Sequence, residues 1–238
     1  MFGVPGNWDT CAERLAPRWR VFAPELPLFS LPAARATVDG IGEAVREWLA
    51  AVGIGRVILG GNSLGGHVAL HLALGEPARV AALVLAGSSG LFERGFERVP
   101  RRPSREWLAA RVREVFYDAS LVTEAMVDEV AAVIGNRASA RQFLRIAKST
   151  KQQPLHGELH RIRCPSLLMW GANDQITPPA VAREFHDLLP HSELQFIDRC
   201  GHAPMIERPQ KFCDLLEQFL ERIKPLLQDP APVRGQPG

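Results

Sequence analysis

The sequence predicts an α/β fold: a mostly parallel sheet covered by helices on both faces, with an inserted helical cap. Short runs that are apolar at nearly every position recur along the chain, and stretches with helical spacing separate most of them. Strands that are apolar on both faces are typical of a parallel sheet buried between two helical layers. In addition, residues 91–163 contain only helical patterns, far more than an ordinary crossover needs, and this predicts the cap.

The runs predicted as strands end at turn-forming residues or at the start of a loop. In chain order they are Trp19–Ala23, Arg56–Leu59, Val80–Ala86, Ser166–Trp170 and Leu194–Ile197. The helices are assigned from apolar residues spaced three or four positions apart, which form one buried face. They are Trp8–Leu15, Val38–Val52, Leu64–Leu74, Pro179–Leu189 and Pro209–Ile223, while three prolines make Pro24–Pro32 a loop.

These elements predict one core that the cap interrupts. The core is assigned to residues 1–90 and 164–224, the cap to residues 91–163, and the proline-rich residues 225–238 to a disordered tail. A group of arginines at the start of the cap is predicted to be a solvated loop, with a clamp for an anionic substrate as the alternative: Arg94, Arg98, Arg101, Arg102 and Arg105. Four apolar side chains are candidates for lining a pocket, although core packing explains each of them as well: Phe92, Trp107, Met126 and Phe143.

The strongest candidate for chemistry lies within Arg56–Leu74. There an apolar run leads directly into Gly61-Asn62-Ser63-Leu64-Gly65, and an apolar helical pattern follows. A strand that turns at once into a helix exposes the central residue above the sheet edge, and side chains are not expected to fit two positions before and after it. Ser63 is therefore predicted to be a nucleophile, with free N–H groups at the helix start beside it. A glycine-rich turn with an idle serine is the alternative.

Partners for Ser63 are expected at the carboxyl ends of the other strands, where open α/β sheets carry their chemistry. Asp174 follows one apolar run and His202 follows the next. In this order the three residues match the nucleophile, acid and base of a hydrolytic triad. His202 is predicted to accept the proton of Ser63, and Asp174 to fix the tautomer of the imidazole. A turn-capping aspartate and a surface histidine are the alternatives.

Other polar residues near these positions have simpler explanations. Asp198 is a rival acid, but it stands only four residues before His202 and is better placed to support the loop than to reach the ring. His67 and His71 share a helix face at a spacing found in metal sites, yet no third ligand accompanies them. A packed or polar-edge role is predicted for this pair, and neither a metal nor a cofactor is expected.

Composition argues against several classes of function. The net charge of +2 is too close to neutral to indicate nucleic acid or an anionic membrane as partner. No apolar run is long enough to span a bilayer, and the start of the chain lacks the pattern of a signal peptide. The cysteines show no paired spacing, so free thiols in a cytoplasmic protein are expected: Cys11, Cys164, Cys200 and Cys213. A small molecule is the expected substrate.

Several short motifs stand at the turns described above: Gly3-Val4-Pro5-Gly6, the Gly60–Gly66 turn, Gly171-Ala172-Asn173-Asp174 and Gly201-His202. Together they resemble the α/β-hydrolase superfamily in its capped, single-domain form, over nearly the whole chain. Three further stretches are similar to those of the hydrolases of meta-cleavage products, which cut carbon–carbon bonds: Gly61–Gly66, Phe116–Ser120 and Asp198–His202. The resemblance implies that the backbone N–H groups of Val4 and Leu64 are the oxyanion donors.

The chain departs from the family pattern in places that bear on the reaction. Phe2-Gly3 stands where members carry His-Gly, and Ala203 stands where the carbon–carbon hydrolases carry a tryptophan. The resemblance therefore implies a serine hydrolase acting without a cofactor on a small, largely apolar ester, thioester or vinylogous diketone, and leaves the choice open. A catalytically silent ligand-binding protein of the same fold and a perhydrolase-like enzyme are the alternatives.

In the resembled fold, a central strand precedes the turn at Gly3-Val4. That strand lies between Trp19–Ala23 and Arg56–Leu59, and only Met1 and Phe2 of it are present. We therefore expect the natural protein to extend upstream of Met1 by about thirty residues.

Overall fold

The computed structural model describes residues 5–92, 100 and 103–227. Its frame is a parallel sheet of four strands in the order β1-β2-β3-β4: Val57–Asn62, Val80–Ala86, Ser166–Gly171 and Ser192–Ile197. Every residue of β2 and β3 is buried, as their continuous apolar runs predicted. The prediction of a parallel sheet is confirmed, and its carboxyl ends meet at one edge.

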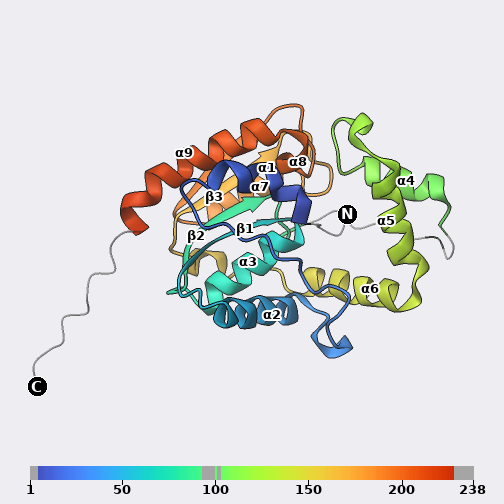
Figure 1. The fold of residues 1–238 in the computed structure, drawn as a ribbon, viewed down its shortest axis with the longest axis horizontal. Helices are drawn as coiled ribbons and strands as arrows, with labels where there is room; N and C mark the ends of the chain where they lie inside the picture. Colours follow the sequence, from blue (N-terminus) through green and yellow to red (C-terminus); the bar gives the residue numbers. More distant parts are fainter. Residues whose placement is uncertain (1–4, 93–99, 101–102, 228–238) are drawn as a thin grey trace, which may run out of the picture.

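Helices cover both faces of the sheet (Figure 1). One layer contains α2 (Val38–Ala51), α3 (Leu64–Gly75) and α7 (Pro179–Leu188), and the other contains α1 (Asp9–Leu15), α8 (Pro204–Glu207) and α9 (Pro209–Leu227). Successive residues of β2 pack into different layers, because side chains alternate along a strand: Leu83 and Leu85 join the first, whereas Val84 and Ala86 join the second. Short 3₁₀ turns are found at Pro5–Trp8, Ala33–Arg35, Ala119–Leu121 and Leu159–Arg161.

Between β2 and β3 the described residues form α4 (Arg105–Arg113), α5 (Glu124–Gly135) and α6 (Arg137–Gln152), with no strand among them. In Figure 1, α4 and α5 stand beside the sheet and α6 returns toward α2. Each helix begins at a side-chain cap, from Ser104, Thr123 and Asn136 respectively. The apolar stripe of α4 packs onto the layer that contains α9, through Leu108 and Val112.

The prediction of a strand at Trp19–Ala23 is wrong. This segment has no regular structure, and Val21 and Phe22 are 37% and 40% exposed. A strand forms only where a neighbouring backbone completes the hydrogen-bond ladder. Among the described residues, no strand pairs with this segment, and β1 pairs only with β2.

The predicted disordered tail begins too early. Helix α9 continues through Pro225 to Leu227, and Leu227 packs against the cluster of buried residues around α9. Proline ends a helix only when the lost hydrogen bond is not offset, and here apolar contact extends the helix by less than one turn. The rest of the predicted tail, residues 228–238, lies outside the described residues.

The helices and the cysteines bear on two expectations drawn from the sequence, namely no membrane-spanning segment and no disulfide. None of the helices in the described part of the chain combines the length and apolarity that crossing a bilayer demands. All four cysteines are free, and the Sγ atoms of Cys11 and Cys213 lie 2.8 Å apart between α1 and α9.

Candidate active site

Ser63 lies at the sharp turn between β1 and α3. Its backbone has φ 52° and ψ −117°, a conformation that costs free energy for any residue with a side chain. Its N–H donates to the carbonyl of Ala86 at 3.0 Å, and its own carbonyl accepts from the N–H of Ser89 at 3.1 Å. These bonds to the end of β2 and the residues after it hold the turn. Ser63 is half-buried and lines a mainly apolar cavity of about 1220 Å³.

The backbone approaches itself closely at Gly61. A Cβ there would lie 2.2 Å from the carbonyl carbon of Gly65 and 2.4 Å from the nitrogen of Gly66. A Cβ at Gly65 would meet no atom within 4 Å. The expectation that neither position accepts a side chain is therefore right for Gly61 and wrong for Gly65, because the Cβ position of Gly65 faces open space.

We expect Gly61→Ala to lower the free energy of unfolding by about 3 kcal/mol or more, because its new methyl group meets backbone atoms that cannot rotate away. This loss corresponds to a fall in melting temperature of roughly 6–12 °C for a domain of this size. Gly65→Ala is the matched control, and it should melt within about 3 °C of the wild type. Thermal unfolding followed by circular dichroism measures both melting temperatures. Equal melting temperatures for the two variants would contradict the close approach of the backbone at Gly61.

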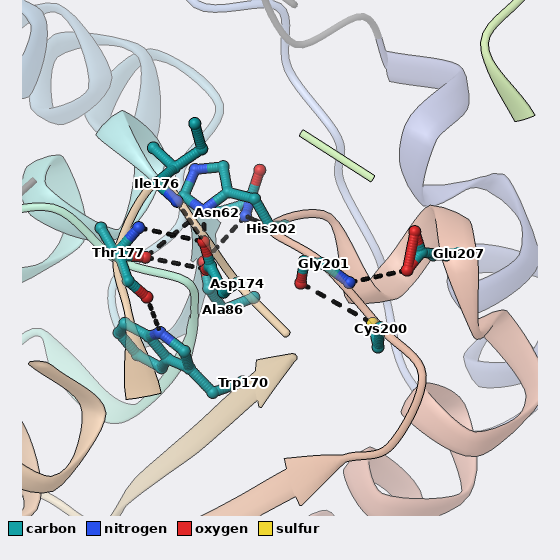
Figure 2. A network of polar contacts seen from close by, with 10 residues as sticks. All are labelled: Asn62, Ala86, Trp170, Asp174, Ile176, Thr177, Cys200, Gly201, His202 and Glu207. Atoms are coloured by element: carbon teal, nitrogen blue, oxygen red, sulfur yellow. Dashed lines mark hydrogen bonds and ion pairs between the residues drawn. The ribbon is translucent and has the colours of Figure 1, made fainter. Parts of the chain in front are cut away.

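Asp174 and His202 meet at the ends of β3 and β4 (Figure 2). His202 Nδ1 lies 2.8 Å from Asp174 Oδ2, and the two residues are 6% and 3% exposed. Asp174 Oδ1 accepts from the N–H groups of Ile176 at 2.8 Å and Thr177 at 3.0 Å. Thr177 Oγ1 donates to Asp174 Oδ2 at 2.9 Å. The carboxylate is thus held from four directions, and its orientation fixes that of the imidazole.

Residues that the sequence analysis did not single out complete this arrangement. Asn62 Nδ2 donates to the carbonyl oxygens of His202 and Ala86, both at 2.8 Å, and so joins the histidine loop to the sheet (Figure 2). Gly87, at φ 49°, leaves room for the pair, since a Cβ there would lie 2.9 Å from His202 Nδ1 and 3.1 Å from Asp174 Oδ2. The sequence contained one sign of this role, because Gly87 directly follows the apolar run Val80–Ala86 at the carboxyl end of a strand.

The structure brings Ser63 and His202 to the same cavity. Within the described residues no hydrogen bond joins Ser63 Oγ to the imidazole. Asp198, the rival acid, is exposed, and it is Asp174 that contacts the ring. Of the two candidate acids, Asp174 is therefore the one placed to orient the imidazole.

Of the two expected oxyanion donors, Leu64 lies within the described residues. Leu64 is the first residue of α3, so its N–H has no acceptor within the helix, and it lines the cavity beside Ser63. Val4 lies outside the described residues.

The cap contributes only part of the predicted lining. Trp107 and Phe143 line the cavity. Phe92 is 54% exposed and does not line it, and Met126 packs instead against the core around α4 and α9. Phe92 and Met126 were candidates because an apolar cap residue can face a pocket or pack in the core. The docking of the helices, which the sequence does not reveal, determines which of these it does.

The arginines at the start of the cap can be placed at one position. Arg105 forms ion pairs with Glu124 and Asp128 on the cap itself and does not line the cavity. Arg105 is exposed, as predicted, but it begins α4, so the predicted loop is wrong at this position. Its ion pairs within the cap do not support a substrate clamp. Arg94, Arg98, Arg101 and Arg102 lie outside the described residues.

His67 and His71 pack together beneath the turn, with ring centroids 5.1 Å apart. His67 Nε2 lies 3.2 Å from the carbonyl of Gln153, and His71 Nδ1 lies 3.0 Å from Asp39 Oδ1. Burial, aided by His71, lowers the pKa of His67 to about 4, and burial outweighs Asp39 to lower the pKa of His71. In the described part of the chain no group of three or more His, Cys, Asp or Glu side chains is arranged to hold a metal ion.

His67 makes the fold sensitive to acid. Unfolded, a histidine takes up its proton below about pH 6.5, whereas folded His67 does so only near pH 4. The unfolded state therefore binds more protons in this window, and stability falls as pH falls from 6.5 toward 4, by about 3 kcal/mol for this group.

The matching variant is His67→Gln, whose amide retains a donor for the Gln153 carbonyl but does not titrate. Urea unfolding at a series of pH values should show a flatter dependence for the variant between pH 6.5 and 4, and the same dependence as the wild type above pH 7. Parallel curves throughout would contradict the role of His67.

Comparison with known proteins adds to this geometry. The model of the Alpha/beta hydrolase family matches residues 2–215. A 2-hydroxy-6-oxononadienedioate/2-hydroxy-6-oxononatrienedioate hydrolase from Burkholderia vietnamiensis is 32% identical over 185 residues, which cover 72% of this chain and 64% of that protein. The match thus spans less than two thirds of the relative.

Two other relatives are matched over more of their length. A pimeloyl-(acyl-carrier protein) methyl ester esterase from Nitrosomonas europaea is 30% identical over 224 residues, which are 87% of each chain. A solved structure, that of MGS-MChE2, an alpha/beta hydrolase enzyme from the metagenome of sediments from the lagoon of Mar Chica, Morocco, is 31% identical with a TM-score of 0.76. That match covers 94% of this chain and 88% of the other.

Proposed function

The chain belongs to the alpha/beta hydrolase family, as its motifs predicted, and we propose that it is a serine hydrolase in which Ser63, His202 and Asp174 form the catalytic triad. The observation that carries the proposal is the 2.8 Å contact between buried Asp174 and His202, whose ring shares a cavity with the strained Ser63. A strained residue at a cavity wall is typical of a nucleophile held in position for reaction.

In the proposed reaction, Ser63 Oγ attacks the carbonyl carbon of the substrate while His202 Nε2 takes the hydroxyl proton. The negative charge moves to the carbonyl oxygen, where the N–H of Leu64 stabilises it, together with that of Val4 by resemblance. The intermediate collapses, and His202 returns its proton to the leaving group. Water then attacks the acyl carbon while His202 takes its proton. The second intermediate collapses, the acid product leaves, and His202 returns the proton to Ser63 Oγ.

The proposed substrate is a small, largely apolar ester, thioester or vinylogous diketone. The mainly apolar lining of the cavity supports this class. The names of the relatives support keeping both bond types, since one is named as a hydrolase of 2-hydroxy-6-oxononadienedioate, which is not an ester, and another as a methyl ester esterase. Turnover of aryl esters of increasing chain length, beside a ring-fission diketone, distinguishes between them.

A fluorophosphonate probe tests the proposed nucleophile directly. The expected result is stoichiometric labelling, which peptide mass spectrometry assigns to Ser63, with no labelling of Ser63→Ala. A folded sample that refuses the probe would overturn the proposal and favour a silent ligand-binding protein of the same fold. Circular dichroism of the same sample establishes that it is folded.

A further inference from the structure

Glu207 carries a buried carboxylate that the proposed reaction does not use. The residue is 4% exposed, at the end of α8, and within the described residues it has no ion pair. Its Oε1 accepts from the N–H of Gly201 at 2.6 Å (Figure 2). Its Oε2 accepts from the N–H groups of Tyr117 at 2.7 Å and Asp118 at 3.4 Å. Burying a carboxylate is costly, and here backbone donors offset the cost.

These donors belong to two segments far apart in the sequence. Gly201 directly precedes His202, whereas Tyr117 and Asp118 belong to the linker 114–118, which joins α4 to the next turn of the cap. Among the described residues, no other group accepts from the N–H groups of Gly201 and Tyr117. Glu207 therefore joins the histidine loop to the cap linker.

The linker also contacts the histidine loop directly. The N–H of His202 donates to the carbonyl of Val115 at 2.7 Å. A Cβ at Gly201 would lie 2.6 Å from that same carbonyl oxygen and 2.8 Å from the nitrogen of Tyr117, so the two backbones are in close contact. Loss of the Glu207 carboxylate would leave buried N–H groups unpaired on both sides of this contact, and the contact would have to open to admit water.

We propose that Glu207 is a positioning residue, which holds the loop of His202 against the cap linker so that the imidazole stays aligned between Asp174 and Ser63. This inference rests on the proposed function of Ser63 and His202. Displacement of a catalytic group by about 1 Å costs on the order of a hundredfold in rate. A carboxylate suits the position because each oxygen faces a backbone donor, whereas a glutamine amide offers one acceptor and points its own donors at the other N–H.

The test is Glu207→Gln, which keeps the shape of the side chain. The expected result is a fall in kcat of about 10- to 100-fold per folded molecule, with KM within about twofold, because the base moves and the cavity does not. Amide hydrogen exchange at Gly201, His202 and Tyr117 should accelerate together. A role confined to stability would lower the folded fraction and leave kcat per folded molecule unchanged.

Ile41→Ala provides the control for stability. Ile41 is fully buried in α2, in the layer opposite to α8, and its truncation lowers the melting temperature without touching the junction. Its kcat per folded molecule and the exchange of Gly201 and Tyr117 are expected to match the wild type. Glu207→Asp, which keeps the charge but is too short to reach both segments, is the second variant if Glu207→Gln does not fold.

The outcomes separate this inference from the proposed function. Unchanged kcat and unchanged exchange in a folded Glu207 variant would overturn the positioning role. Full activity of Ser63→Ala would overturn the nucleophile, yet faster exchange at the junction would still report the contacts of Glu207. Gly201→Ala disturbs the same junction from the other side, and its effect on kcat should be less than additive with that of Glu207→Gln.

Discussion

Replacing Ser63 with alanine is expected to abolish turnover, with a loss in kcat of roughly four to six orders of magnitude. The reason is chemical, because the variant lacks the only atom that forms the acyl-enzyme in the proposed reaction. The fold should survive, since alanine retains the Cβ of serine and the turn is held by backbone bonds to Ala86 and Ser89. Steady-state kinetics on an aryl ester measure the loss, and thermal melting measures the fold.

Ser166→Ala is the matched control for this change. Ser166 is a buried serine, but it lies at the amino end of β3, at the opposite edge of the sheet from the site, and its Oγ donates to the carbonyl of Cys164. It should keep its activity. If Ser63→Ala retained more than a few per cent of wild-type kcat, the assignment of the nucleophile would have to be abandoned.

Asp174→Asn is expected to lower kcat by about three to four orders of magnitude. The Oδ1 position faces the N–H groups of Ile176 and Thr177, so the amide oxygen must occupy it. The amide nitrogen then points at His202 Nδ1 and favours the tautomer with its proton on Nε2, which cannot accept the proton of Ser63.

Asp198→Asn distinguishes the two candidate acids. Asp198 is exposed, four residues before His202, and its replacement should leave kcat within about twofold of the wild type, as surface substitutions usually do. Equal losses for the two asparagine variants would show that the contact between Asp174 and His202 does not orient the base. Substrate kinetics at pH 7 to 8 measure both.

The sequence by itself determined the parts of this protein that depend on neighbouring residues. The continuous apolar runs of β2 and β3 predicted buried parallel strands, because such residues have no solvent-facing side. The turn at Ser63 was also predictable from the sequence, because the close approach that requires glycine at position 61 is to Gly65, only four residues along the chain. Asp174 was found by its position at a strand end, a rule that follows from parallel topology.

Only the tertiary structure decided the features that depend on contacts between distant segments. Trp19–Ala23 has the composition of a strand, yet it forms none, because a ladder requires a partner alongside it. Met126 and Trp107 both pack against the core around α4 and α9, but of these two the docking of the cap places only Trp107 at the cavity as well. The carboxylate of Glu207 bonds to backbone N–H groups, which every residue except proline carries, so no side-chain pattern marks its partners 90 residues away at Tyr117.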